Sequence, residues 1–457
     1  MRRLILSIFL FFFFACGNTV AEIFLSEDLS KSLSNLYSFH PQIKYEREIL
    51  KSKDELLPRA FSEFRPEIKG YYQKGKIDTN SEGFNISSDG IRTETNKGVV
   101  VSQSIFDGGS SLSQIKVAKN EIFSQSRSLK NVEQEVFLDA IKLYADLATE
   151  NSNIKVKEKN VEVLKRQLEL TKEQFEIGEV TLTDVSISEA RYSLSESELL
   201  ETFNIIDSIN AKYLSIFGSK PDNPEIIIPT DYGKFEIQKL KSIGKKNNPR
   251  IEAIIFLIRS IENEINSLKR KRLPSLKLEA EAKINQGYFR TDSEREVLSA
   301  FAKVDIPLYQ SGLASSKIRE SKKKLFAQKE LLRLENENLV ANLISSHSSY
   351  NYSLSRIEAY KKQIQSNKIY LDGLKQEFQL GERTTLDVLD GEQELLQSEL
   401  DLIKAYKDFF ISYYEILFYI GKLNAKDLKL NVDLFDYEKN YNKVKGKWLD
   451  IIEWINS

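Results

Sequence analysis

Two stretches of the chain carry apolar residues at seven-residue intervals. The two sets are Ile154, Val161, Leu168 and Phe175 and, 203 residues later (378 − 175), Ile357, Ile364, Leu371 and Phe378. An ordinary amphipathic helix drifts away from a strict seven-residue repeat, so this spacing is typical of a coiled coil. The pattern predicts a continuous helix over residues 110–177, roughly 100 Å long at 1.5 Å per residue, and a similar one after Gly312. Returning helices are predicted over 183–217 and 386–420, and they supply part of the packing that such long helices need.

A second pattern, alternation with a period of two, precedes each long helix. It is clearest over residues 276–284, where leucine, alanine and isoleucine alternate with lysine and glutamate. Its partner over 296–308 also has one apolar face, and the first-half equivalents over 67–76 and 95–106 alternate more weakly. The pattern predicts strands with lipid on one side and water on the other, although a half-buried soluble sheet would look similar.

The rest of each half is simpler. A helix is predicted at the start of each half, over residues 26–57 and 237–272. The loops between the paired strands, 77–90 and 286–293, are rich in Asn, Ser, Gly and Asp and are predicted to be exposed.

The two halves are copies of one another. The segment from Phe175 to Val185 recurs as the segment from Phe378 to Val388. A repeat of this length is a whole structural half, which completes its core with further copies. Four strands per chain cannot close a membrane barrel, since the smallest have about eight, so a membrane role demands an oligomer, and three copies would give twelve strands. The expected domains are a signal peptide (1–21), a first repeat (22–218), a linker (219–236), a second repeat (237–421) and a C-terminal tail (422–457).

The N-terminus has the three regions of a secretory signal. Arg2 and Arg3 precede an apolar run, and small residues ending at Ala21 follow it, which predicts cleavage after Ala21. The only cysteine, Cys16, offers a rival interpretation as a lipid-attachment site at the cleavage point. No later apolar run reaches the roughly 18 residues of a membrane-spanning helix.

Composition excludes some classes of function. Lys plus Arg (66) nearly equals Asp plus Glu (67), which leaves no basic excess for the phosphate backbone of a nucleic acid. The two histidines, His40 and His347, belong to no Ser/His/Asp order, and neither zinc-ligand spacing nor a phosphate loop is present. We therefore expect no catalytic residues, no metal and no cofactor.

Each pair of long helices is joined by the duplicated segment, which reads as a capped turn. Gly178 and Gly381 are placed to end one helix in a left-handed conformation. Thr181 with Asp184, and Thr384 with Asp387, have the spacing of capping boxes that start the next helix.

The capping box of Thr384 and Asp387 does not account for a further aspartate, Asp390. It follows Asp387 by three residues and so shares its helix face. Around the axis of a symmetric oligomer, Asp387 and Asp390 would form two stacked carboxylate rings, which attract and bind blocking cations and suit a charged constriction. Taken alone, such a pair is more often part of a solvated face.

Together these features resemble the TolC-type outer-membrane channel proteins. The resemblance covers nearly the whole mature chain. It rests on the duplicated turn, on the strand-to-helix junctions at 104–109 and 306–312, on the pattern over 389–398, and on the ending 434–441 with Trp448. That ending resembles the tail of family members associated with type I secretion.

The resemblance implies a fold that is mainly α with β. A homotrimer would form a twelve-stranded outer-membrane barrel continued by a long periplasmic helical coiled-coil tunnel, in a Gram-negative bacterium. The chain would be the passive exit duct of a tripartite system for type I protein secretion or multidrug efflux. Its partners would be outer-membrane lipid, a periplasmic adaptor (membrane fusion protein) and an inner-membrane pump. The alternative is a periplasmic coiled-coil adaptor or structural protein, which would share the heptads but would not need the paired strands.

The resemblance also implies roles for residues near the turns. Asp387 and Asp390 match the family's constricting aspartates, which form the gate. The residues at latch positions are Thr183, Asp184 and Arg383, with Phe378 where a tyrosine is expected and Tyr406 where an arginine is expected. The residues where an adaptor would dock are Gly178, Glu179, Thr181, Gly381, Glu382 and Thr384. An Arg383 hydrogen bond to Asp184 or Thr183 would hold the closed state.

Overall fold

A computed structural model describes most of the chain. The described residues are 25–79, 90–219, 224–226 and 235–448. The predicted signal peptide and Cys16 lie outside them, as do residues 80–89 of one predicted loop, most of the predicted linker and the last nine residues of the predicted tail. The domain boundaries themselves stay a prediction.

The described residues fall into two compact units, which we treat separately. The first, here called the hairpin unit, takes its residues from Met1–Ser32, Ile141–Lys239 and His347–Tyr413. The second, the sheet unit, takes its residues from Leu33–Ala140, Leu240–Ser346 and Tyr414–Ser457.

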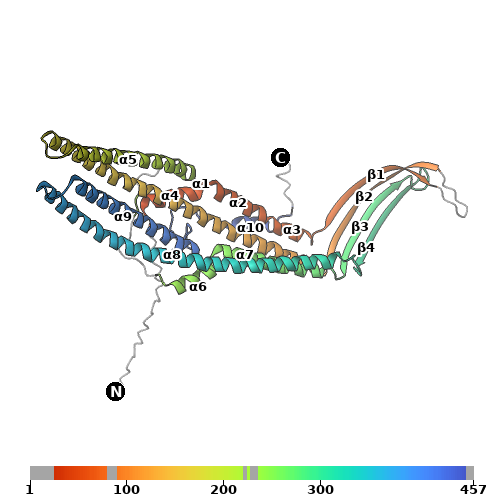
Figure 1. Ribbon diagram of the computed structural model, residues 1–457. Helices are drawn as coiled ribbons and strands as arrows, with labels where there is room; N and C mark the ends of the chain where they lie inside the picture. The colour runs from red at the N-terminus through yellow and green to blue at the C-terminus, as the bar shows by residue number, and fades with distance from the viewer. Residues whose placement is uncertain (1–24, 80–89, 220–223, 227–234, 449–457) are drawn as a thin grey trace, which may run out of the picture. The chain divides into compact units, whose positions relative to one another are not determined.

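Four strands of the sheet unit form one antiparallel sheet in the order β1-β2-β3-β4 (Figure 1). The strands are β1 (Glu67–Thr79), β2 (Gly90–Phe106), β3 (Ser275–Gln286) and β4 (Glu294–Asp305). The prediction of four strands per chain is confirmed. Some boundaries were wrong. β1 extends past residue 76 to Thr79, and β2 begins at Gly90 and not at residue 95. β4 ends at Asp305 and not at residue 308. Pro307 has no N–H to donate to a neighbouring strand, which accounts for the early end.

The register of the sheet separates an apolar face from a polar one. One row across all four strands consists of Ile68, Val101, Ala280 and Ala300. The adjacent row, on the opposite face, consists of Lys69, Val100, Glu281 and Ser299. The apolar face is open in this single chain, with Leu298 of β4 87% exposed. An exposed apolar surface of this kind marks a site where lipid or another protein binds.

On the polar face, side chains form ion pairs and hydrogen bonds across strands. Lys303 pairs with Glu279 at 2.7 Å, and the hydroxyl of Tyr71 on β1 donates to Glu281 on β3 at 2.8 Å. The Tyr71 bond passes over Gly98 on the strand between them. A Cβ at Gly98 would lie 3.0 Å from the Tyr71 hydroxyl and 2.7 Å from the Ala282 carbonyl oxygen. Glycine is therefore the residue that fits there.

The helices that open each half are interrupted. The first half has α1 (Glu27–Phe39), α2 (Pro41–Asp54) and α3 (Leu56–Ser62), and the second has α6 (Ile237–Asn247) and α7 (Pro249–Arg270). The single helices predicted over 26–57 and 237–272 were therefore wrong. Pro41 and Pro249 each occupy the first position of a new helix, since proline clashes with the carbonyl four residues earlier. Asn248 caps α7 by accepting from the backbone N–H groups of Arg250 and Ile251.

The long helices are present where the heptads predicted them. They are α4 (Ser110–Glu176), α5 (Leu182–Phe217), α8 (Leu313–Gln379) and α9 (Thr385–Tyr419), and a short α10 (Lys439–Val444) follows. The heptad residues Ile357 and Leu371 of α8 are buried, but Phe175 near the end of α4 is 42% exposed. No helix in the described ranges combines the length and apolar character needed to cross a membrane.

The tail after α9 packs on the core of the sheet unit. The core there consists of Leu50, Leu57, Ala60, Ile115, Ala118, Ile122 and Leu129. Phe435, Tyr437 and Tyr441 pack against this cluster. The tail thus completes a core built from α2, α3 and α4.

Candidate functional site

Both helical turns have the predicted capped geometry. Gly178 and Gly381 have φ of 81° and 76°, a region that favours glycine. At the start of α5, Asp184 Oδ2 accepts from the Thr181 backbone N–H at 2.9 Å, and the Thr181 hydroxyl accepts from the Asp184 N–H. Asp387 and Thr384 repeat these bonds at the start of α9. The predicted turns and capping boxes are confirmed.

The capping carboxylates are held in their charged form. Hydrogen bonds from the Thr181 hydroxyl, and then from its backbone N–H, lower the pKa of Asp184. The backbone N–H of Thr384, followed by its hydroxyl, lowers the pKa of Asp387 in the same way. A negative charge at a helix N-terminus is also favoured by the helix dipole. Both turns therefore carry a carboxylate at neutral pH.

Asp390 has a different environment from Asp387. Its Oδ1 accepts a hydrogen bond from Arg191 Nη2 at 3.0 Å, in an ion pair that joins α9 to α5. Both side chains are partly exposed. Arg191 was not among the predicted site residues, because it lies 199 positions from Asp390 and no local pattern links the two. The two aspartates of the predicted gate therefore differ, since Asp387 caps a helix and Asp390 is ion-paired.

Arg383 bonds within its own hairpin in this chain. Its Nε donates to Glu377 Oε2 at 2.8 Å, and this bond raises the pKa of Arg383. Thr183 is exposed. The Thr385 hydroxyl is close to Asp184 and contributes to the lowered pKa of the Asp184 carboxyl. The latch of Arg383 to Asp184 or Thr183 between neighbouring helices stays a prediction.

The two residues that depart from the family's latch pattern have packing partners here. Phe378 packs against a small cluster of Leu371, Leu374 and Val388. The ring centre of Tyr406 lies 5.7 Å from Lys361 Nζ, a cation–π distance. Phe378 thus contributes an apolar contact within its own hairpin.

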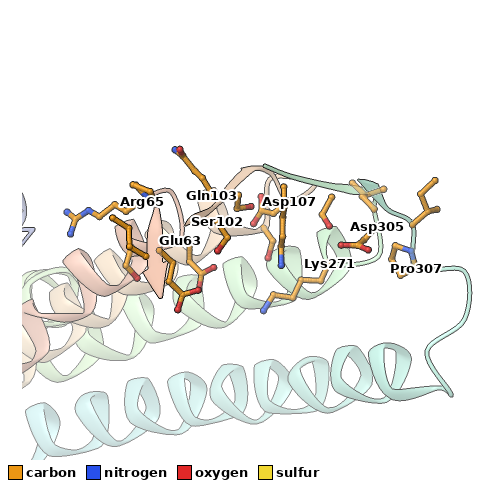
Figure 2. A pocket seen from close by; sticks show the side chains of 18 of the residues that line it. Glu63, Arg65, Ser102, Gln103, Asp107, Lys271, Asp305 and Pro307 are labelled. Atoms are coloured by element: carbon orange, nitrogen blue, oxygen red, sulfur yellow. The ribbon is translucent and has the colours of Figure 1, made fainter. Parts of the chain in front are cut away.

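The sheet unit has a polar hollow at the foot of the strands (Figure 2). Its volume is about 1340 Å³, and it is lined from several elements that meet there. Figure 2 labels eight of the lining residues, namely Glu63, Arg65, Ser102, Gln103, Asp107, Lys271, Asp305 and Pro307. Asp107 fixes one side by accepting from the backbone N–H groups of Gly109 and Ser111 at the start of α4. The lining thus combines charged side chains with apolar ones such as Ile68 and Leu273.

Groups that could bind a metal are lacking in the part of the chain that the structure describes. There, no three or more His, Cys, Asp and Glu side chains come close enough together to hold an ion. The chemistry available near the turns is therefore that of carboxylates, two guanidinium–carboxylate ion pairs and capped helix ends.

Comparison with known proteins gives consistent matches. The family model for "Outer membrane efflux protein" matches residues 60–204 and 242–422. The outer membrane efflux protein BepC of Brucella suis is 26% identical over 431 residues, which cover 93% of this chain and 92% of BepC. The outer membrane protein TolC of Escherichia coli is 25% identical over 270 residues, covering 55% of this chain and 54% of TolC. The crystal structure of the outer membrane protein VceC from Vibrio cholerae superposes with a TM-score of 0.74 at 16% identity, covering 86% of this chain and 96% of VceC.

Proposed function

The chain belongs to the outer membrane efflux protein family, and on that premise we propose that it is a passive exit duct in the outer membrane. The observation that carries this proposal is the sheet of four strands with one open apolar face and one charged face. Lipid on the apolar side and water on the other side suit such a sheet. A periplasmic adaptor built only from helical hairpins would not need a sheet with these two faces.

The sheet also supports a homotrimer. Within one chain, β1 and β4 each pair on one side only. In lipid, every unpaired backbone N–H or C=O costs several kcal/mol, so the two edges need partners. In a trimer, β4 of each copy would pair with β1 of the next, giving the twelve-stranded barrel. The long helices would continue the duct into the periplasm.

The helical turns suit a gate and a docking surface. Asp387 and Asp390 would ring the narrowest point, with Arg383, Thr183, Asp184, Phe378 and Tyr406 setting the contacts that hold it closed. The exposed turns around Gly178 and Gly381 would meet the adaptor, which links the duct to an inner-membrane pump. The names of relatives such as the efflux protein BepC support an export role.

Membrane fractionation tests the exit duct. The full-length protein should be extracted from the outer membrane as a trimer that resists SDS at room temperature and dissociates on heating. Reconstituted into planar bilayers, it should conduct ions without ATP. Recovery as a water-soluble monomer would refute the proposal and favour the adaptor alternative.

The gate predicts a specific change in conductance. In the double variant Asp387→Asn/Asp390→Asn, we expect higher single-channel conductance and weaker block by multivalent cations, because two carboxylate rings lose their charge. Asparagine keeps an oxygen that accepts the capping bonds of Thr384, so α9 should still begin at the same residue. Glu173→Gln/Glu176→Gln is the matched control, since it removes two exposed carboxylates that are also three residues apart, near the first turn and outside the predicted gate and latch. Equal effects of the double variant and the control would rule out Asp387 and Asp390 as the constriction.

A further inference from the structure

A second cavity in the sheet unit lies beneath the tail. Its volume is about 470 Å³, and its lining comes from one face of α4, the start of α7, the segment after α9 and the tail itself. The α4 residues that line it are Arg127, Lys130, Glu133 and Gln134. Spacings of three and four residues place these side chains on one helix face. The cavity is separate from the polar hollow at the foot of the sheet.

Two lysines of this cavity have no anionic partner. Arg127 pairs with Glu252 at 2.7 Å, and Asp427 accepts from the Asn424 amide at 2.6 Å. Lys130 and Lys426, by contrast, form no ion pair or side-chain hydrogen bond with the described residues. The Lys130 ammonium contacts the ring of Tyr437, 4.8 Å from its centre. The lining also contains the carboxylates of Glu133, Glu252 and Asp427, but neither lysine forms an ion pair with them, so both ammonium groups can still donate hydrogen bonds to an added anion.

The same cavity contains a buried hydrogen-bond acceptor without a donor. Gln134 is 1% exposed, and its Oε1 has no hydrogen-bond partner. The neighbouring Glu133 is 3% exposed but has partners, since Tyr437 donates to its Oε2 at 2.6 Å and its Oε1 forms a 3.6 Å ion pair with Arg47. An unsatisfied buried acceptor costs roughly 1–3 kcal/mol, so a ligand that brings a donor would be favoured.

We propose that this cavity binds a phosphate group, either free or in a phosphomonoester. Its anionic oxygens would accept from the ammonium groups of Lys130 and Lys426. The P–OH of free hydrogen phosphate, or a hydroxyl on the organic group of a phosphomonoester, would donate to the free oxygen of Gln134. Sulfate is an anion of similar size but has no proton at neutral pH, so it could satisfy the lysines and not the acceptor. A cavity of 470 Å³ also has room for a small organic group on the phosphate.

The electrostatics of the cavity agree with an anion near Lys130. Burial, and then the Arg127 charge, lower the pKa of Lys130, and Lys426 lowers it further. Glu252 and Glu133 act in the opposite direction. A bound anion would restore the pKa of Lys130 and offset the repulsion between the two lysines. Because the lining comes from α4, the segment after α9 and the tail, a bound ligand would also hold the tail against α4.

Calorimetric titration of the purified trimer in phosphate-free buffer tests the site. The probes are inorganic phosphate, glycerol 3-phosphate and sulfate at equal ionic strength. We expect phosphate or glycerol 3-phosphate to bind, with sulfate binding about tenfold more weakly. Lys426→Met, in an exposed position, should weaken phosphate binding about tenfold, the loss of one charge-assisted hydrogen bond. Lys119→Met is the matched control, because Lys119 is an exposed lysine of α4 outside the cavity.

The variant Gln134→Leu tests the hydrogen bond to the Gln134 oxygen separately from the binding of the anion by the two lysines. It removes the acceptor and keeps both lysines, so the preference for phosphate over sulfate should shrink. Tighter binding of glycerol 3-phosphate would identify an ester as the natural ligand, and tighter binding of inorganic phosphate would identify the free ion. The proposal is overturned if neither phosphate probe binds, if sulfate binds the native protein equally well, or if Lys426→Met behaves like Lys119→Met.

Discussion

An arginine at position 300 is expected to prevent assembly in the outer membrane, whereas an arginine at position 299 should leave assembly intact. Ala300 lies in the apolar row with Ala280 and Val101, near the middle of β4. An arginine facing lipid near the bilayer midplane costs about 2–4 kcal/mol, and a trimer would carry this cost at three positions. Ser299 faces the other side and pairs with Glu281, which would attract the new charge.

Adjacent residues of one strand make this comparison well matched. Ala300→Arg and Ser299→Arg introduce the same side chain into the same strand, so they differ only in the face of the sheet. The yield of heat-sensitive trimer from the outer-membrane fraction is the measurement. Equal yields for the two variants would show that the apolar face does not meet lipid.

The second large effect is expected from Arg47→Met, which removes a cation from beneath the tail. The Arg47 guanidinium lies 4.4 Å from the ring centre of Tyr37 and 5.0 Å from that of Phe435. It also forms a 3.6 Å ion pair with Glu133, which is 3% exposed. Losing one member of a buried ion pair costs roughly 3–5 kcal/mol, because the remaining charge is left uncompensated. Urea titrations should therefore show a lower free energy of unfolding.

The pH dependence of the unfolding free energy of Arg47→Met tests whether the unpaired Glu133 carboxylate causes the loss of stability. Burial raises the pKa of Glu133 above its ordinary 4.5. A carboxyl with a raised folded-state pKa favours folding at low pH, and that contribution is lost as pH rises through the folded-state pKa. Without Arg47 this pKa rises further, so the loss in Arg47→Met should be largest at neutral pH and shrink as the pH falls towards 4.5.

A double variant provides the control. Arg47→Met/Glu133→Gln removes both charges and keeps an oxygen that accepts from the Tyr437 hydroxyl. We expect it to recover most of the lost stability, and we expect Glu133→Gln alone to lose stability, because it leaves the Arg47 guanidinium without its ion-pair partner. No recovery in the double variant would assign the loss to the aromatic contacts of Arg47.

The elements of the fold were largely predictable. Heptads marked α4 and α8, alternation marked the strands, and the turn motif marked both caps, because each pattern reflects backbone geometry within a few residues. The missed breaks before Pro41 and Pro249 had a local signal too. A proline inside a helix removes one backbone hydrogen bond, and its ring clashes with the carbonyl four residues earlier.

The charged contacts of the candidate site were beyond prediction. Nothing in the sequence around Arg191 indicates that it pairs with Asp390 across 199 positions. Likewise, the sequence marks Asp387 and Asp390 as one pair on a helix face, although their hydrogen bonds differ. The roles of these residues in gating stay predictions.

By itself, the sequence determined the type and order of the elements, the duplication, the capped turns and the two faces of the strands. All of these follow from the period of apolar residues and from short-range hydrogen bonds. Only the tertiary structure decided which charges are buried or paired. Tyr437 reaches Glu133 across 304 positions, and Lys130 and Lys426 come together at one cavity without forming an ion pair with the described residues. Such pairings depend on distances through space, and the stability of a charge depends on the groups that surround it there.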